Sequence, residues 1–296
     1  MTSWERSYAR SAPWFLLPAA VLLGVFVVVP TLHALYLSFH QIDLLSLDRQ
    51  RWSGVSQYAA VLSDPRFRRA FANTALFALL VVPTQTVVSF ALALWVNRPE
   101  APWRALRTVF FAPTVVAMPV LAILWTLLYQ PASGSDAGPI NRVLLGLGLP
   151  AHAWLRDPRT SLLAVAAMSV WQGVGLQMMI FLAGLKAVPP AQLEAAKLDG
   201  ASAWQRTWHI TIPALRNTFV FVLSVTSIFA FRLFVQPYLM TRGGPGNSSV
   251  SLVEAIYEMT FVAQDLGMAC AASMLLLVTL CVLTALQRLA LAEVRE

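Results

Sequence analysis

The chain has 296 residues, of which 58% are hydrophobic and 12% are charged, and its formal net charge is +7. Soluble domains contain about 25% charged residues, so this composition excludes an ordinary water-soluble globular protein. The basic residues lie between long apolar blocks rather than in runs mixed with aromatic residues, which argues against a nucleic-acid-binding protein and points to membrane topology as the reason for the positive charge.

Long apolar blocks recur along the whole chain. A helix needs about 20 apolar residues to cross a bilayer, and its backbone groups must be satisfied within the segment. We therefore predict an all-α membrane protein with about six transmembrane helices. The predicted spans are 14–37, 71–96, 108–129, 161–185, 217–237 and 266–286, in one membrane domain over 14–290, flanked by an N-terminal segment, 1–13, and a tail, 291–296.

The first span follows a short segment that carries Arg6 and Arg10. No small-residue cleavage site is evident, so we interpret this span as an uncleaved anchor rather than a signal peptide. Six spans place both termini on the same side of the membrane. The basic residues outside the spans divide almost evenly between the two sides, so charge alone favours cytoplasmic termini only weakly.

The connection over 40–70 is predicted to be a long polar loop that ends in a basic cluster. This cluster comprises Arg66, Arg68 and Arg69.

Prolines within the second and third spans are expected to kink these helices and to open space in the bundle. These prolines are Pro83, Pro113 and Pro119.

The fourth predicted span contains the run WQGVGLQ, residues 171–177. An indole ring can stack on a sugar ring, and amides can hydrogen bond to its hydroxyl groups. One interpretation is therefore a polar surface along a substrate pathway. The alternative is close helix packing through the two glycines of the run.

The loop after this span, 186–216, contains few flexible residues and is predicted to be helical. Pro189 and Pro190 suit a helix start, and Trp204 and Trp208 are spaced to lie on one helix face. Three interpretations need no partner: the helix lies in the headgroup plane, packs on its own bundle or simply connects two spans. A fourth is that the helix docks a soluble partner.

The fifth predicted span holds Arg232, the one ionisable side chain placed clearly within a span. Ionisable residues in membrane spans are candidates for function. The spacing of Arg232 and Gln236 predicts a shared helix face, which we interpret as lining a translocation path. The alternative is that Arg232 extends its side chain to the outer headgroup region, because it lies near the end of the span.

Common catalytic and nucleotide-binding motifs are absent from the sequence. It contains no G-x-x-x-x-G-K-[ST] phosphate loop, H-E-x-x-H, C-x-x-C or G-x-S-x-G. The histidines show no metal-ligand spacing, and Cys270 and Cys281 are too far apart along one helix to form a disulfide. We therefore predict no catalytic residue, no metal site and no cofactor bound by this chain.

The loop after the fourth span also carries a spaced motif. The triplet EAA, residues 194–196, is followed by Gly200, Ile210 and Pro213. This pattern resembles the EAA loop of bacterial ABC importer permeases, in which EAA precedes a glycine and then Ile-x-Leu-Pro at fixed distances. Ile212 stands where leucine is usual, which is a conservative change.

Further segments resemble the carbohydrate-type permeases of the same family, those of the maltose and glycerol-3-phosphate type. The resemblance covers about 14–290. The segments are Asn73-Thr74, Leu155–Asp157, Trp171, Gly184-Leu185, Asp199-Gly200-Ala201 and Thr241-Arg242-Gly243-Gly244-Pro245.

In that family the EAA loop forms a coupling helix that sits in a groove of a cytoplasmic ATPase. The resemblance implies a coupling loop over 189–213, which would dock the ATPase through Glu194, Ala195, Ala196, Asp199, Gly200, Ala201, Trp204, Ile210 and Pro213. It implies these partners: a second homologous permease, two copies of an ABC ATPase that bind ATP and Mg²⁺, an extracytoplasmic solute-binding protein, and the lipid bilayer. It also implies a bacterial cytoplasmic (inner) membrane location with both termini cytoplasmic.

The leading hypothesis is thus a permease subunit, not an enzyme, that forms half of an uptake pathway for a sugar or related polyol. Candidate pathway residues are Trp171, Gln172, Gln177, Arg232, Gln236 and Tyr238. The alternative is a stand-alone secondary transporter or channel, which predicts charged relays in the membrane or paired interrupted helices. A membrane enzyme would need a buried acid, base or metal cluster, and none is visible in the sequence.

Overall fold

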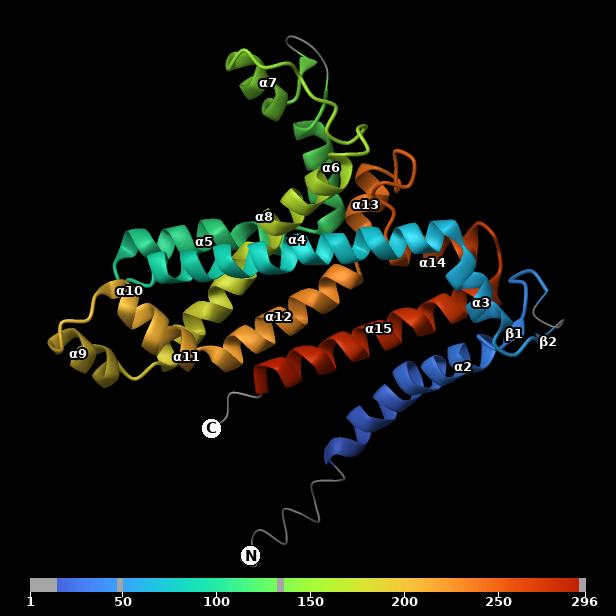
Figure 1. Ribbon diagram of the computed structural model, residues 1–296, viewed down its shortest axis with the longest axis horizontal. Coiled ribbons are helices and arrows are strands. Elements are labelled where there is room, and N and C mark those ends of the chain that lie inside the picture. Colours follow the sequence, from blue (N-terminus) through green and yellow to red (C-terminus); the bar gives the residue numbers. More distant parts are fainter. Residues whose placement is uncertain (1–14, 47–49, 132–135, 293–296) are drawn as a thin grey trace, which may run out of the picture. The chain divides into compact units, whose positions relative to one another are not determined.

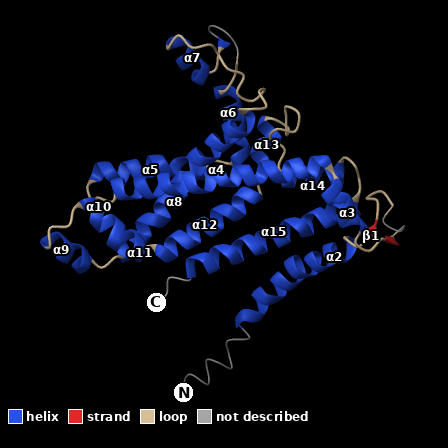
Figure 2. Cartoon of the chain, in the orientation of Figure 1, coloured by secondary structure: helices blue, strands red, loops and turns tan. Residues whose placement is uncertain are grey.

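Helices make up most of the described chain (Figure 2). A computed structural model describes residues 15–46, 50–131 and 136–292 (Figure 1). The expected N-terminal segment, 1–13, lies outside the described residues, as does most of the expected tail, 291–296.

The chain divides into two compact units. The first comprises the described parts of 1–64 and 256–277, and the second comprises those of 65–255 and 278–296. The single membrane domain expected over 14–290 stays a prediction.

Among the described residues, five helices are long and apolar enough to cross a membrane. They are Phe15–Leu37, Pro65–Val96, Ser161–Ala187, Arg216–Met240 and Leu266–Leu289. A sixth candidate is the bent pair formed by α5 (Ala101–Val115) and α6 (Met118–Leu128). These helices confirm the all-α class with about six transmembrane helices.

The first unit begins with the apolar helix Phe15–Leu37, which contains a π-helical segment, η1 (Gly24–Val28), and α2 (Val29–Leu37). Large apolar side chains such as Phe15 and Phe26 are exposed along this helix. A helix that is apolar on all sides is stable when lipid or another protein surrounds it.

A short hairpin and a small core complete the first unit. The elements are β1 (His40–Gln41), β2 (Arg51–Trp52), which pairs antiparallel with β1, α3 (Ser56–Ser63) and the first part of α15 (Leu266–Ala292). A β-bridge joins Asp43 to Asp265, and Leu37, Ile42 and Cys270 pack together. These contacts hold the start of α15 against the hairpin.

The second unit holds two long helices, α4 (Pro65–Val96) and α8 (Ser161–Ala187), with α5 and α12 packed against them (Figure 1). The other elements are α7 (Pro139–Gly146), α9 (Pro190–Leu198), α10 (Ala203–Arg206), η3 (Thr207–Thr211), α11 (Ile212–Ala214), α12 (Arg216–Phe231), α13 (Val235–Met240) and α14 (Leu252–Phe261). The last residues of α14, from Ile256 on, belong to the first unit.

The basic cluster expected at the end of the loop over 40–70 lies inside α4 instead. Arg66, Arg68 and Arg69 occupy the first turns of this helix, which starts at Pro65. Proline favours the first helical position because its missing N–H has no partner there anyway, so the helix begins before the apolar block does.

The third predicted span is not one straight helix. α5 and α6 meet at an angle of 100°, and Val116 and Ala117 between them have extended backbone. Pro119 explains the break, because a proline lacks the N–H that would bond to the carbonyl four residues earlier, and its ring clashes with that carbonyl. That carbonyl belongs to Val115, the last residue of α5.

The fifth predicted span is also broken. α12 ends at Phe231, and α13 restarts at Val235 after a non-helical residue, Phe234, which has φ −144° and ψ −58°. Leu233 lies within the break, and Pro237 follows it by four residues. Pro237 has no N–H to donate to the Leu233 carbonyl, so a proline explains this break too. Arg232 and Gln236 therefore do not share one helix face, and that prediction was wrong.

Candidate functional site

The coupling loop over 189–213 bends at Gly200. α9 ends in a Schellman motif, in which the Gly200 N–H donates to Lys197 O and the Ala201 N–H donates to Ala196 O. Gly200 has φ +80°, in the left-handed region that favours glycine. A Cβ at this position would meet no atom within 4 Å, so the backbone conformation alone requires glycine.

The helix after the bend, α10, is capped at its N-terminus by its own residues. Ser202 Oγ accepts from the Gln205 N–H at 3.2 Å, and the Gln205 side chain accepts from the Ser202 N–H at 2.7 Å. This capping box starts α10 and satisfies two helix donors. Arg206 Nη1 also donates to Ala201 O. The end of α9 and the start of α10 are therefore both stabilised by hydrogen bonds within the loop itself.

The coupling loop exposes an apolar patch formed by two tryptophan side chains. The rings of Trp204 and Trp208 stack with centroids 5.7 Å apart, and the two residues are 71% and 55% exposed. Glu194 is also exposed. Next to the bend is a hollow of about 390 Å³, lined by Ala196, Asp199, Gly200, Ala201, Gln205, Arg206, His209 and Ile210. Exposed aromatic residues beside a hollow suit the binding of another protein.

The inner side of the loop packs on the helices. Leu193 and Ile210 contact a buried cluster from α4, α8 and α12 and the residues next to them. The buried members of this cluster are Ala93, Val96, Met178, Phe181, Leu182, Leu185, Val188, Leu215 and Val222. Ile210 therefore supports the loop from within, while Ala195 and Pro213 remain exposed.

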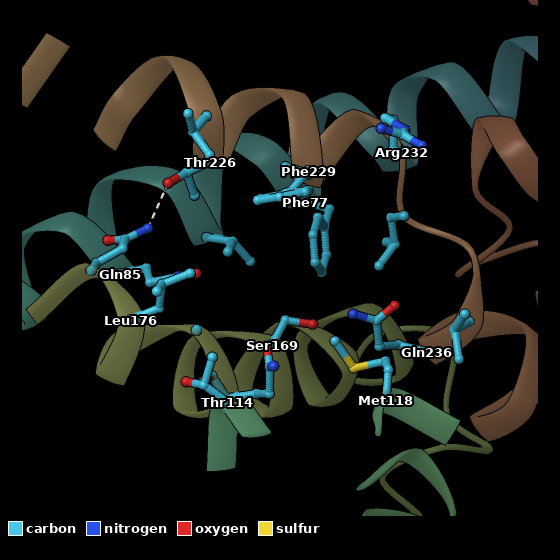
Figure 3. A pocket seen from close by; sticks show the side chains of 18 of the residues that line it. Phe77, Gln85, Thr114, Met118, Ser169, Leu176, Thr226, Phe229, Arg232 and Gln236 are labelled. Atoms are coloured by element: carbon cyan, nitrogen blue, oxygen red, sulfur yellow. Dashed lines mark hydrogen bonds between the residues drawn. The ribbon is translucent and has the colours of Figure 1, made fainter. Parts of the chain in front are cut away.

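A cavity of about 500 Å³ lies between α4, α8 and α12, with further walls from α5, α6 and α13. Figure 3 shows Phe77 and Phe229 on one side of it and Ser169 and Gln236 on the other. Gln85, Thr114, Gln172, Gln177 and Thr226 add polar groups, and Arg232 is the one ionisable side chain among the described lining residues.

Four of the six predicted pathway residues line this cavity: Gln172, Gln177, Arg232 and Gln236. Trp171 does not, because adjacent helix residues point about 100° apart, and its ring instead meets Trp125 edge-on at 5.5 Å. Trp171 lines a separate, more apolar hollow beside α5. Tyr238 stacks on Phe234 at 5.0 Å and is not among the cavity-lining residues.

Several lining residues are not evident from the sequence. Thr114 and Ser169 are isolated polar residues in apolar blocks, and Gln85 lies between two threonines. Phe77 and Phe229 look like ordinary lipid-facing or core residues. Buried amides and hydroxyls in a membrane span are a usable signal, since each needs a partner there. A single uncharged polar residue is a weaker sign of function in a membrane span than an ionisable residue such as Arg232.

The two glycines of the 171–177 run serve helix packing. A Cβ on Gly175 would overlap the carbonyl oxygen of Phe110 in α5, and one on Gly173 would overlap Gln85 Nε2 in α4. The packing alternative therefore explains the glycines, while Gln172 of the same run faces the cavity.

The Asn73-Thr74 segment contacts the end of the loop that begins with the motif segment over 241–245. Asn73 Nδ2 donates to Asn247 O at 2.8 Å and to Val250 O at 3.1 Å. Thr74 Oγ1 accepts from the Leu252 N–H at 3.0 Å. The Asn73-Thr74 pair on α4 therefore holds the glycine-rich loop over 241–251, and the two segments form one structural unit.

Replacing Asn73 by alanine should loosen this loop. The partly buried carbonyl of Asn247 and the buried carbonyl of Val250 would lose their donor, at a cost of about 1–3 kcal/mol. We expect faster amide hydrogen exchange and faster proteolysis within 241–251. Alanine at the exposed Asn217 is the matched control and should leave both rates unchanged. Unaltered exchange in the Asn73 variant would contradict the clamp.

Residues 58–295 match a family model described as the binding-protein-dependent transport system inner membrane component. The chain belongs to this family. It is therefore a permease, a membrane subunit of an ABC importer rather than an enzyme, and it is an inner-membrane component of a transport system that depends on a binding protein.

Known proteins similar to the permease agree with this assignment. It is 34% identical to the probable ABC transporter permease protein YurN of Bacillus subtilis, covering 90% of this chain and 91% of that one. It is 32% identical to the sn-glycerol-3-phosphate transport system permease protein UgpA of Agrobacterium fabrum, covering 91% and 90%.

The fold matches a solved transporter as well. The crystal structure is that of a bacterial ABC transporter involved in the import of the acidic polysaccharide alginate, with a TM-score of 0.84, 20% identity and full coverage of both chains. At this identity the likeness concerns the fold alone.

Proposed function

We propose that the permease forms one half of the membrane pathway through which a sugar or related polyol enters the cell. The observation that carries this proposal is the lining of the cavity, which combines aromatic rings with amides and one guanidinium group. Rings can stack on a sugar, amides can bond its hydroxyls, and arginine can bond a phosphate or carboxylate. The name of the glycerol-3-phosphate permease supports the same class of substrate.

We also propose that the coupling loop docks a separate ATPase. The self-capped bend at Gly200 and the exposed Trp204–Trp208 pair support this role. Two ATPase copies would bind ATP and Mg²⁺, and a second homologous permease would supply the other half of the pathway. An ATPase needs cytoplasmic nucleotide, so both termini and the coupling loop would be cytoplasmic, and the binding protein would deliver the substrate from outside.

The full complex in proteoliposomes tests the function. Purified binding protein is first screened against maltose, lactose, glycerol 3-phosphate and amino acids, and uptake of the bound compound is then measured with ATP. Carbohydrate or polyol uptake that requires ATP and the ATPase is the expected result. Full uptake by this chain alone without ATP would favour the stand-alone transporter, and amino-acid uptake would contradict the substrate class.

Alanine at Gln172, Arg232 or Gln236 should reduce uptake by about tenfold or more, because an unpaired polar group on a bound substrate costs about 1–3 kcal/mol. Assembly with the ATPase should be unchanged, since these residues line the cavity far from the coupling loop in sequence. The measurement is the initial rate of ATP-dependent uptake per assembled complex.

The matched control is alanine at Arg159, an exposed arginine that is not among the cavity-lining residues. It should transport at the wild-type rate. Normal transport by all three cavity variants would show that the pathway lies elsewhere.

A further inference from the structure

A short chain of hydrogen bonds joins three helices beside the cavity. Gln177 Nε2 on α8 donates to Thr226 Oγ1 on α12 at 2.5 Å. Ser89 Oγ on α4 lies 3.2 Å from Gln177 Oε1, and its hydrogen is shared with Gln85 O of its own helix at 2.5 Å. Ser89, Gln177 and Thr226, here called the polar tie, are all buried.

The polar tie has a defined place relative to the coupling loop. α8 ends at Ala187 and α12 begins at Arg216, so these two helices flank the loop. Gln177 lies ten residues before that end and Thr226 ten residues after that start, which is about 15 Å along each helix. The tie therefore links the two helices at matching distances from the loop.

Different contacts lie on the two sides of the tie. On the side of the coupling loop, α8 and α12 meet through apolar residues such as Phe181 and Val222. The cavity begins beside the tie, since Gln177, Thr226 and Val222 line it, and it extends past the tie to Gln172 and Arg232. The tie therefore lies between the loop and the residues proposed to meet substrate.

Apolar contacts are non-directional, so they hold two helices in register only through the fit of their side chains. A buried hydrogen bond is directional, and within a membrane no water replaces a partner that moves away. Thr226 is further fixed because its own hydroxyl donates to Val222 O at 2.7 Å. The bond between Gln177 and Thr226 therefore holds α8 and α12 in one register.

We propose that the polar tie makes α8 and α12 move as one body, so that a displacement of the coupling loop reaches the cavity. Gln177 is then a positioning residue, and Thr226 is its acceptor. This inference rests on the docking role proposed for the loop, and it assigns to Gln177 a role in transmission rather than in substrate contact.

Spin-label distances test the transmission in the full complex with its ATPase. One label pair, at Met179 and Phe221, lies between the tie and the coupling loop, and a second, at Leu163 and Phe229, lies beyond the tie; all four residues are exposed. Cys270 and Cys281 are first replaced by alanine. Both distances are measured before and after trapping with ATP and vanadate.

In the wild type both distances should stay constant on trapping, because α8 and α12 move as one body. In Thr226→Val, which keeps the side-chain shape but loses the hydroxyl, both distances should change on trapping, because the two helices then move separately. Thr226→Ser should restore the constant distances. The matched control is Thr86→Val, which removes an equally buried hydroxyl bonded only to Val82 O of its own helix, and it should behave as wild type.

Distances that also stay constant in Thr226→Val would overturn the inference. So would a wild-type complex in which these distances change although the ATPase remains bound, and this result would leave the docking proposal intact. Loss of the ATPase from the wild-type preparation would instead contradict the docking proposal.

Discussion

Replacing Gly200 by valine should abolish co-purification of the ATPase with the permease and, with it, ATP-dependent uptake. Gly200 has φ +80°, and a left-handed conformation costs an L-residue about 1–2 kcal/mol, with a β-branched residue at the high end. Open space surrounds the position, so the effect arises from the backbone and not from a clash. The bend between α9 and α10 would open, and the docking surface would lose its shape.

A graded series sharpens this test. Asparagine tolerates the left-handed region better than alanine, and alanine better than valine, so ATPase retention should fall in that order. Gly148 is the matched control, because it has φ +75°, a Cβ added there would also meet no atom within 4 Å, and it lies outside the coupling loop. Its valine variant should retain the ATPase.

Removing the Glu194 carboxylate tests the same proposed docking surface without changing the backbone of the bend. Its side chain is exposed, so Glu194→Ala should leave the yield and melting temperature of the permease unchanged while weakening ATPase retention. Stoichiometric ATPase in both Gly200→Val and Glu194→Ala would contradict the docking role of the loop.

Replacing Gly175 by alanine should strongly destabilise the permease. The new Cβ would overlap the carbonyl oxygen of Phe110, which belongs to the backbone of α5 and cannot rotate away. α5 would have to separate from α8, and such overpacking costs about 1–3 kcal/mol or more. The expected result is a lower thermal unfolding temperature in detergent and a lower yield of assembled complex.

Gly173→Ala provides the comparison. Its Cβ would approach Gln85 Nε2, the end of a flexible side chain that can adopt another rotamer. The variant should fold but change the cavity, so uptake should fall more than the melting temperature does. Equal melting temperatures for the two variants would contradict the close α5–α8 contact.

The number and type of the helices could be predicted because a bilayer sets a minimum apolar length, and each block meets it. The breaks within them could not. Pro83 and Pro113 lie inside the continuous helices α4 and α5, whereas Pro119 and Pro237 lie just after breaks. Whether a proline breaks a helix depends on how neighbouring groups satisfy the freed carbonyl, and this is a property of the packed bundle.

The candidate site was predictable where local geometry determines it. The spaced glycine of the coupling loop does occupy the left-handed position, and Gln172, Arg232 and Gln236 do reach the cavity. Trp171 does not, since its neighbour Gln172 already faces the cavity. Gln177 lines the cavity, but its bonds to Ser89 and Thr226 depend on how three distant segments pack, which spacing along one helix does not reveal.

The two caps on either side of Gly200 have an evolutionary consequence. Because the Schellman motif and the capping box use only residues of 196–205, the bend needs nothing from the rest of the bundle except apolar contacts for Leu193 and Ile210. A segment that encodes its own shape can be inherited or exchanged as a unit. Permeases could therefore diverge in their cavities, and so in what they carry, while the docking role proposed for this segment is kept.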